Sequence, residues 1–165
     1  MKQLILLIAI LLAGCTSQQT EQLSQQQQDQ IKTEIKVMVD TMFAKVVRLD
    51  VRGVIQYYWD SPEFSSYNAD GSRSDFAALK KEVAWFADSV TAFKMATVRE
   101  EFPVLMKDLV ICVWVGNDEL TLKSGNTINY DPDASTFVFR KIDGTWKIVF
   151  THESATITTQ KSGKK

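Results

Sequence analysis

The side chains that most often bind zinc are scarce in this sequence, which has one histidine and two cysteines among 165 residues. A structural zinc site needs a cluster of His and Cys ligands, so we expect no metal site of this kind. A lone thiol also cannot form an internal disulfide, and only Cys112 is left if Cys15 is modified as argued below. Cys112 lies in a β-branched run, which is typical of a small buried apolar residue.

Neither sign of charge dominates the chain, which carries 19 basic and 20 acidic side chains. There is no basic stripe to pair with phosphates, and we therefore expect no nucleic-acid binding. The sequence also lacks a glycine-rich phosphate loop and the spacing of a calcium loop. On this basis we predict no cofactor.

A long apolar run is missing as well. The run from Leu4 to Leu12 has about nine residues, whereas a membrane-spanning helix needs about 20. Lys2 precedes this run, and small residues follow it before Cys15. A charged start, a short apolar run and small residues are the layout of a secretory signal, so we predict that residues 1–14 are a cleaved leader.

The segment Leu12-Ala13-Gly14-Cys15 resembles the lipobox of bacterial lipoproteins. The resemblance implies that the sulfur of Cys15 carries a lipid that anchors the mature chain to a membrane. The alternative is an ordinary secreted protein in which Cys15 is incidental. Because Thr16 rather than Asp follows the cysteine, the resemblance implies the periplasmic face of the outer membrane if the host is Gram-negative.

Residues 16–30 are polar and carry eight glutamines, without an apolar pattern. Such a segment buries too little surface to offset its ordering entropy, so we predict a tether over residues 15–30. The segment 158–165 is also polar and is predicted to be a tail. Residues 31–157 remain, which is the length of one domain.

Helical periodicity is confined to the first half of this domain. Apolar residues recur at helical spacing over 31–49, and shorter patterns predict helices over 51–58 and 75–89. Alternating patterns then dominate the second half. They predict strands over 64–67, 92–102, 105–115, 119–123, 134–142 and 145–155.

Turn signals separate the predicted strands. Residues 116–118 (Gly-Asn-Asp) and 131–133 (Asp-Pro-Asp) are predicted turns, and Asp143-Gly144 is a strong hairpin signal. Helices followed by hairpin-linked antiparallel strands indicate the α+β class.

This order of elements, which ends in Asp143-Gly144-Thr145-Trp146-Lys147-Ile148 and then His152-Glu153-Ser154, resembles the nuclear-transport-factor-2-like (NTF2-like) superfamily. It is most similar to the SnoaL-like and ketosteroid-isomerase-like branch. The resemblance implies a cone, in which three N-terminal helices pack inside a strongly bent antiparallel sheet with a pocket at its wide end. It also implies a homodimer formed through the outer face of the sheet.

Side-chain alternation along the last strand predicts which residues face the pocket. Trp146, Ile148, Phe150, His152 and Ser154 share one face, which is apolar as far as His152. His152 is therefore the candidate acid or base, with a histidine that merely caps the core as the alternative. Asp60 and Asp108 are acidic candidates, although an exposed position for Asp108 is the favoured interpretation. The residues expected to contact a ligand are Tyr58, Trp59, Trp114, Trp146, Phe150 and His152.

Three functions remain open at this point. The favoured one is a lipid-anchored envelope protein whose pocket binds a small, largely apolar molecule without catalysis, because no complete catalytic set is visible. The second is a lyase or isomerase that uses His152 as general acid or base. The third is a dimeric assembly module.

Overall fold

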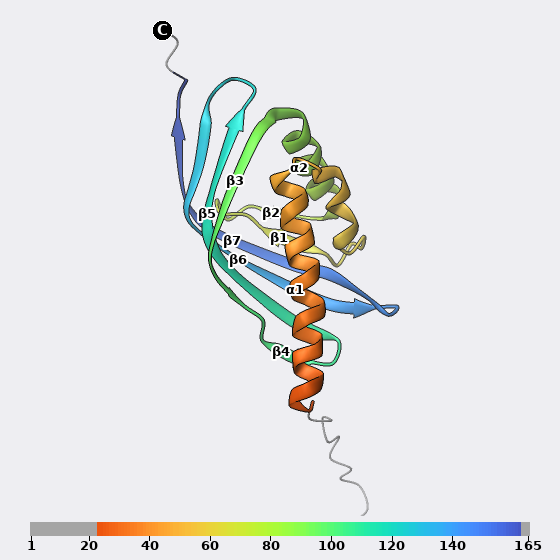
Figure 1. The fold of residues 1–165 in the computed structure, drawn as a ribbon. Helices are drawn as coiled ribbons and strands as arrows, with labels where there is room; N and C mark the ends of the chain where they lie inside the picture. The colour runs from red at the N-terminus through yellow and green to blue at the C-terminus, as the bar shows by residue number, and fades with distance from the viewer. Residues whose placement is uncertain (1–22, 163–165) are drawn as a thin grey trace, which may run out of the picture.

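The computed structural model describes residues 23–162, and the predicted leader and Cys15 lie outside them. Two α-helices pack inside a strongly curved sheet (Figure 1). Helix α1 spans Gln25–Val47 and α2 spans Phe76–Ser89. The α+β class and the bent antiparallel sheet are confirmed. None of the described helices is both long enough and apolar enough to span a membrane.

All seven strands belong to one sheet, in which β4 lies beside the main order and pairs with β5. The order in this sheet is β2-β1-β7-β6-β5-β3. Two short strands, β1 (Ser65–Tyr67) and β2 (Arg73–Ser74), form one edge, and β1 runs parallel to β7. The antiparallel remainder consists of β3 (Val90–Glu101), β4 (Val104–Met106), β5 (Leu109–Leu122), β6 (Thr127–Ile142) and β7 (Thr145–Gln160).

Helix α1 begins six residues earlier than its apolar pattern predicts, so residues 25–30 of the predicted tether are helical. The reason is a capping box: the backbone N–H of Gln27 donates to Ser24 Oγ, and the N–H of Ser24 donates to the Gln27 side chain. These bonds satisfy two donors that a helix start otherwise leaves free. Glutamine is also a good helix former.

The predicted second helix consists of two separate 3₁₀ turns, η1 (Val51–Gly53) and η2 (Ile55–Tyr57). Glycine and β-branched residues are weak helix formers, which accounts for the absence of a regular α-helix here. The turns still bury Val51 and Val54, as an amphipathic helix would.

The main hydrophobic core lies between α1 and the central strands. Ile35 and Val39 of α1 are fully buried against Val110, Phe139 and Ile148 of the sheet. The predicted hairpin turn is confirmed, because Asp143 and Gly144 both have the positive φ that this turn requires (49° and 79°). It joins β6 to β7 at the narrow end of the core.

Two of the predicted turns are irregularities within long strands instead. Strand β5 continues through 116–118 with a register shift between Gly116 and Asp118. Strand β6 continues through 131–133, where Asp131 and Pro132 form a bulge. Gly116 is required there because a Cβ would collide with the Trp114 ring and the Ala96 carbonyl. A bulge leaves one side chain unpaired and changes which residues beyond it face inward.

Candidate functional site

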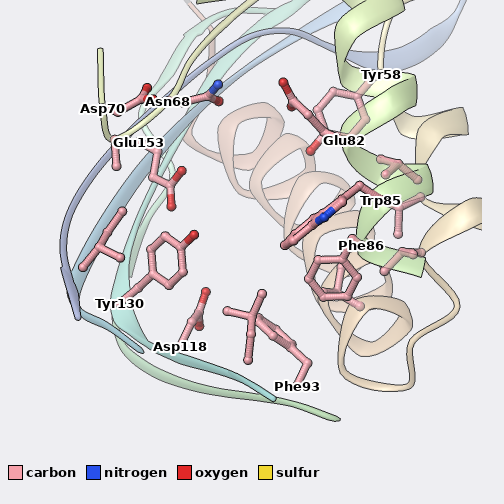
Figure 2. Close-up of a pocket in the computed structure, with 17 residues that line it drawn as sticks. Tyr58, Asn68, Asp70, Glu82, Trp85, Phe86, Phe93, Asp118, Tyr130 and Glu153 are labelled. Carbon is pink, nitrogen blue, oxygen red and sulfur yellow. The ribbon is translucent and has the colours of Figure 1, made fainter. Parts of the chain in front are cut away.

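A cavity of about 510 Å³ opens between α2 and the inner face of the sheet (Figure 2). Its volume lies within the range of about 300–1,000 Å³ that is usual for small-molecule sites. Seventeen residues line it, and they come from the end of α1, the 3₁₀ turns, the β1–β2 loop, α2 and strands β3, β5, β6 and β7.

One wall of the cavity is aromatic. Trp85 and Phe86 project from α2, and Phe93 of β3 packs edge-on against Phe86 with the ring centroids 5.6 Å apart. The Trp85 side chain is 51% exposed, and Figure 2 shows its indole directed into the cavity. This wall presents a broad apolar surface to a bound molecule.

The opposite wall, on the sheet, carries carboxyl groups. Asp118 of β5 and Glu153 of β7 point into the cavity, with the phenol of Tyr130 from β6 beside them (Figure 2). Asp118 pairs in register with Tyr130, and Ser135 pairs with Glu153. Asp133 is 3% exposed. It accepts a long hydrogen bond (3.4 Å) from the hydroxyl of Ser135.

These carboxyl groups hold their protons unusually tightly. Burial, together with the neighbouring Asp133 and Glu153, raises the pKa of Asp118 to about 7. Burial and Asp133 raise the pKa of Glu153 to about 7, and burial raises that of Asp133 to about 6. Low solvent access disfavours the anion at all three acids, and nearby like charges add to this effect at Asp118 and Glu153. Perturbed acids in a cavity are typical of functional sites.

The rim next to α2 is also polar. Glu82 of α2 accepts a short hydrogen bond from Ser74 Oγ, while Asn68 and Asp70 come from the β1–β2 loop. Burial and the nearby Glu82 raise the pKa of Tyr58 to about 12. Tyr58 is therefore a neutral phenol at the cavity wall.

His152 does not line this cavity, which corrects the prediction from alternation. Strand β6 pairs Phe139 with Ile148 but Val138 with Phe150, so Val149 is an extra residue in β7. This bulge reverses the alternation: residues 146 and 148 face inward before it, and 151 and 153 face inward after it. His152 is consequently exposed on the outer face, and Glu153 takes the inward position.

Of the predicted ligand contacts, the structure places only Tyr58 at the cavity. Trp114 is 2% exposed in the core, where its Nε1 donates to Thr97 Oγ1 at 2.9 Å. Trp146 is buried elsewhere and donates from Nε1 to Glu34 at 3.0 Å. Phe150 packs against Tyr67, with ring centroids 5.9 Å apart, and Trp59 lies outside the cavity lining.

The acidic candidates from the sequence, Asp60 and Asp108, do not line the cavity either. The acids that do were missed for two reasons. Asp118 was assigned to a turn, and Glu153 was assigned to the outer face. The sequence carried no signal for Asp118, because Gly-Asn-Asp between apolar segments is typical of an exposed turn.

Within residues 23–162, no group of three or more His, Cys, Asp or Glu side chains is arranged to hold a metal ion. The cavity acids lie close enough to influence one another's pKa, but not in the arrangement of ligands around one ion. The arrangement is instead suited to hydrogen bonding and to charge pairing with a bound molecule.

No family model and no curated protein matches this sequence. Solved structures do. An NTF2-like superfamily protein from Salmonella enterica superimposes with a TM-score of 0.67 at 15% identity, covering 83% of this chain and 98% of that one. An NTF2-like protein of unknown function from Pseudomonas putida superimposes with a TM-score of 0.64 at 16% identity, covering 78% of this chain and 88% of that one.

Structures of enzymes share the same architecture. Hexachlorocyclohexane dehydrochlorinase LinA-type3 from Novosphingobium barchaimii superimposes with a TM-score of 0.64 at 10% identity, covering 83% of this chain and 94% of that one. The domain therefore has the NTF2-like fold. At these identities the likeness defines the fold alone, and function has to be argued from the cavity.

Proposed function

We propose that this domain binds a small, largely apolar molecule in the cavity between α2 and the sheet, without transforming it. The observation that carries the proposal is the cavity itself: about 510 Å³, with an aromatic wall formed by Trp85, Phe86 and Phe93. A concave, mostly apolar site with a few convergent polar groups is the usual form of a small-molecule site.

The first test removes the largest apolar side chain of the cavity. N-phenyl-1-naphthylamine is a neutral dye that brightens in apolar surroundings, and its affinity is measured by fluorescence titration. Trp85→Ala is expected to weaken binding by about tenfold or more, because the indole supplies much of the apolar contact. Folding should change little, since the ring is already 51% exposed.

His152→Ala is the matched control, because this side chain is exposed on the other face of the sheet. It should leave the dye affinity unchanged. Equal binding by wild type and Trp85→Ala would place the dye elsewhere and refute the assignment of the cavity.

Proton transfer, as in a lyase, is a second candidate function. It is favoured by one observation: Asp118 and Glu153 face the cavity with pKa values of about 7, where a carboxyl group can both give and take a proton. Dehydrochlorinases are among the proteins of this fold. Mass spectrometry of a molecule recovered after incubation separates the two functions, because a binding protein returns it unchanged.

The predicted anchor complements this function, and we propose that Cys15 carries the lipid that holds the domain at the cell envelope. Expressed as the full chain in a Gram-negative host, the protein should incorporate labelled palmitate and sediment with membranes. Cys15→Ser should lose the label completely, because the other thiol, Cys112, is buried in the core and is outside the lipobox. A labelled Cys15→Ser protein would contradict the anchor, and Cys112→Ser is the control that should retain the label.

A further inference from the structure

The charge on the cavity wall has one sign. Four of the lining side chains carry carboxyl groups, and among the described lining residues none is Lys, Arg or His. A fifth acid, Asp133, lies buried behind them. The four are Asp70, Glu82, Asp118 and Glu153.

Several acids elsewhere in the described residues are paired with bases. Lys45 contacts Asp50 at 2.7 Å, and Lys94 contacts Glu119 at 2.7 Å on the strands next to the cavity. None of the ion pairs found over residues 23–162 includes a cavity acid. Within the described residues, the cavity acids therefore have no basic partner.

One cavity acid is left without a donor. The Oδ1 atom of Asp118 is shielded from solvent, and it accepts no hydrogen bond from the described residues. Buried acceptors in native proteins almost always have a donor, so an unsatisfied one in a cavity wall indicates a group that a ligand completes. Its neighbours Tyr130 and Glu153 face the same space (Figure 2).

From these observations we infer that the molecule bound here is a cation: an amine or quaternary ammonium group attached to an apolar body. This inference rests on the proposed binding function and adds the class of ligand. The ammonium group would lie against Asp118 and Glu153, where it offsets their mutual repulsion. The apolar body would lie against Trp85 of α2 on the opposite wall and against Phe93, which projects from β3 beside Asp118 (Figure 2).

The same geometry rejects anions. A carboxylate in this space would be desolvated and would face like charges on the sheet wall, with no base among the described lining residues to pair with it. Aromatic faces add to the selection, because their π-systems attract cations. The site therefore discriminates by charge as well as by size.

Binding of a cation should release protons. Near neutral pH the acids of the sheet wall are partly protonated. A bound ammonium group favours their anionic forms, so protons leave when it binds. Affinity should consequently rise between pH 5 and pH 8. The titratable groups that face this space are Tyr58, Asp70, Glu82, Asp118, Tyr130 and Glu153, with Asp133 behind them.

Three molecules that share an indole ring test the inference: tryptamine (cation), tryptophol (neutral) and indole-3-acetate (anion). Each is titrated at pH 7.5 against the protein loaded with N-phenyl-1-naphthylamine, and displacement is followed by fluorescence. We expect tryptamine to bind about tenfold or more tightly than tryptophol, and indole-3-acetate to bind most weakly. At pH 5, tryptamine should bind more weakly than at pH 7.5.

The double variant Asp118→Asn/Glu153→Gln keeps the shape of the wall and removes its charge. Its preference for tryptamine over tryptophol should fall by about tenfold. Asp143→Asn is the control: this acid is exposed in the β6–β7 turn, and asparagine tolerates its positive φ. Its preference should be unchanged.

The outcomes separate the two proposals. If the dye binds but the three indoles compete equally, or the anion competes best, the cationic ligand is wrong and the binding function stands. If the double variant keeps the full preference for tryptamine, the named acids are wrong. If neither the dye nor any indole binds, the binding function itself fails.

Discussion

Replacement of Trp114 by alanine is expected to lower the free energy of unfolding by about 3–5 kcal/mol. The indole is 2% exposed and packs edge-on against Phe43 of α1, with ring centroids 5.6 Å apart. Its Nε1 hydrogen bond to Thr97 Oγ1 joins β5 to β3. Truncation therefore opens a cavity between helix and sheet and removes the hydrogen bond that joins the two strands.

Urea denaturation followed by circular dichroism measures this effect, and Trp85→Ala provides the comparison. Both changes remove an indole, but Trp85 is half exposed in the cavity wall, so its loss should cost less than about 1 kcal/mol. A Trp114→Ala protein as stable as Trp85→Ala would contradict the assignment of Trp114 to the core. It would revive the sequence-based prediction that this residue contacts a ligand.

The second large effect is a loss of stability as pH rises. The acids Asp118, Asp133 and Glu153 have pKa values of about 7, 6 and 7 in the folded domain, well above those of an unfolded chain. Each favours the folded state while it is protonated, and this contribution disappears as pH rises through the folded pKa. Asp118 and Glu153 are partly open to solvent and the acids interact with one another, so we expect about half of the effect that the three shifts would give separately. The free energy of unfolding should therefore be about 3 kcal/mol higher at pH 5 than at pH 8.

The range above pH 5 avoids an opposing effect. Asp50 and Asp70 have lowered pKa values, through Lys45 and Ser72 respectively, so their contributions are lost only at more acidic pH. Asp118→Asn/Glu153→Gln should flatten the profile and exceed wild type in stability at pH 8. Urea midpoints measured across pH 5–8 decide the matter: a wild-type stability that rises with pH would refute the buried acidic wall.

Much of the fold follows from sequence patterns. Apolar spacing over 31–49 and 75–89 predicts the two α-helices, because a helix must bury one stripe of its surface. Asp143-Gly144 predicts the last hairpin, because few residues accept two consecutive positive φ angles. These signals are local, so a single sequence contains them.

The cavity wall depends on a different kind of signal. Alternation gives the inward face of a strand only while its register is unbroken. The extra residue Val149 carries no turn-forming character, and the sequence offers no reason to place a bulge there. The prediction therefore exchanged the roles of His152 and Glu153.

The sequence signal at the bulge in β6 fits either a turn between strands or a bulge within one strand. Asp131-Pro132 is typical of a turn, and here it occurs within a continuous strand. Long-range pairing with β5 and β7 determines that outcome, and no local pattern records it. The raised pKa values of the neighbouring acids depend on the same pairing, because it brings Asp118, Asp133 and Glu153 together from three strands.

The position of Val149 has an evolutionary consequence. Loss of one codon between this bulge and His152 would shift the later residues of β7 by one position and turn the imidazole inward in place of the Glu153 carboxylate, while Trp146 and Ile148 kept their buried sites. A lineage with this architecture can thus change the chemistry of its interior through a single insertion or deletion, without rebuilding the scaffold. Length polymorphism in the final strand is then as informative about ligand choice as any point substitution.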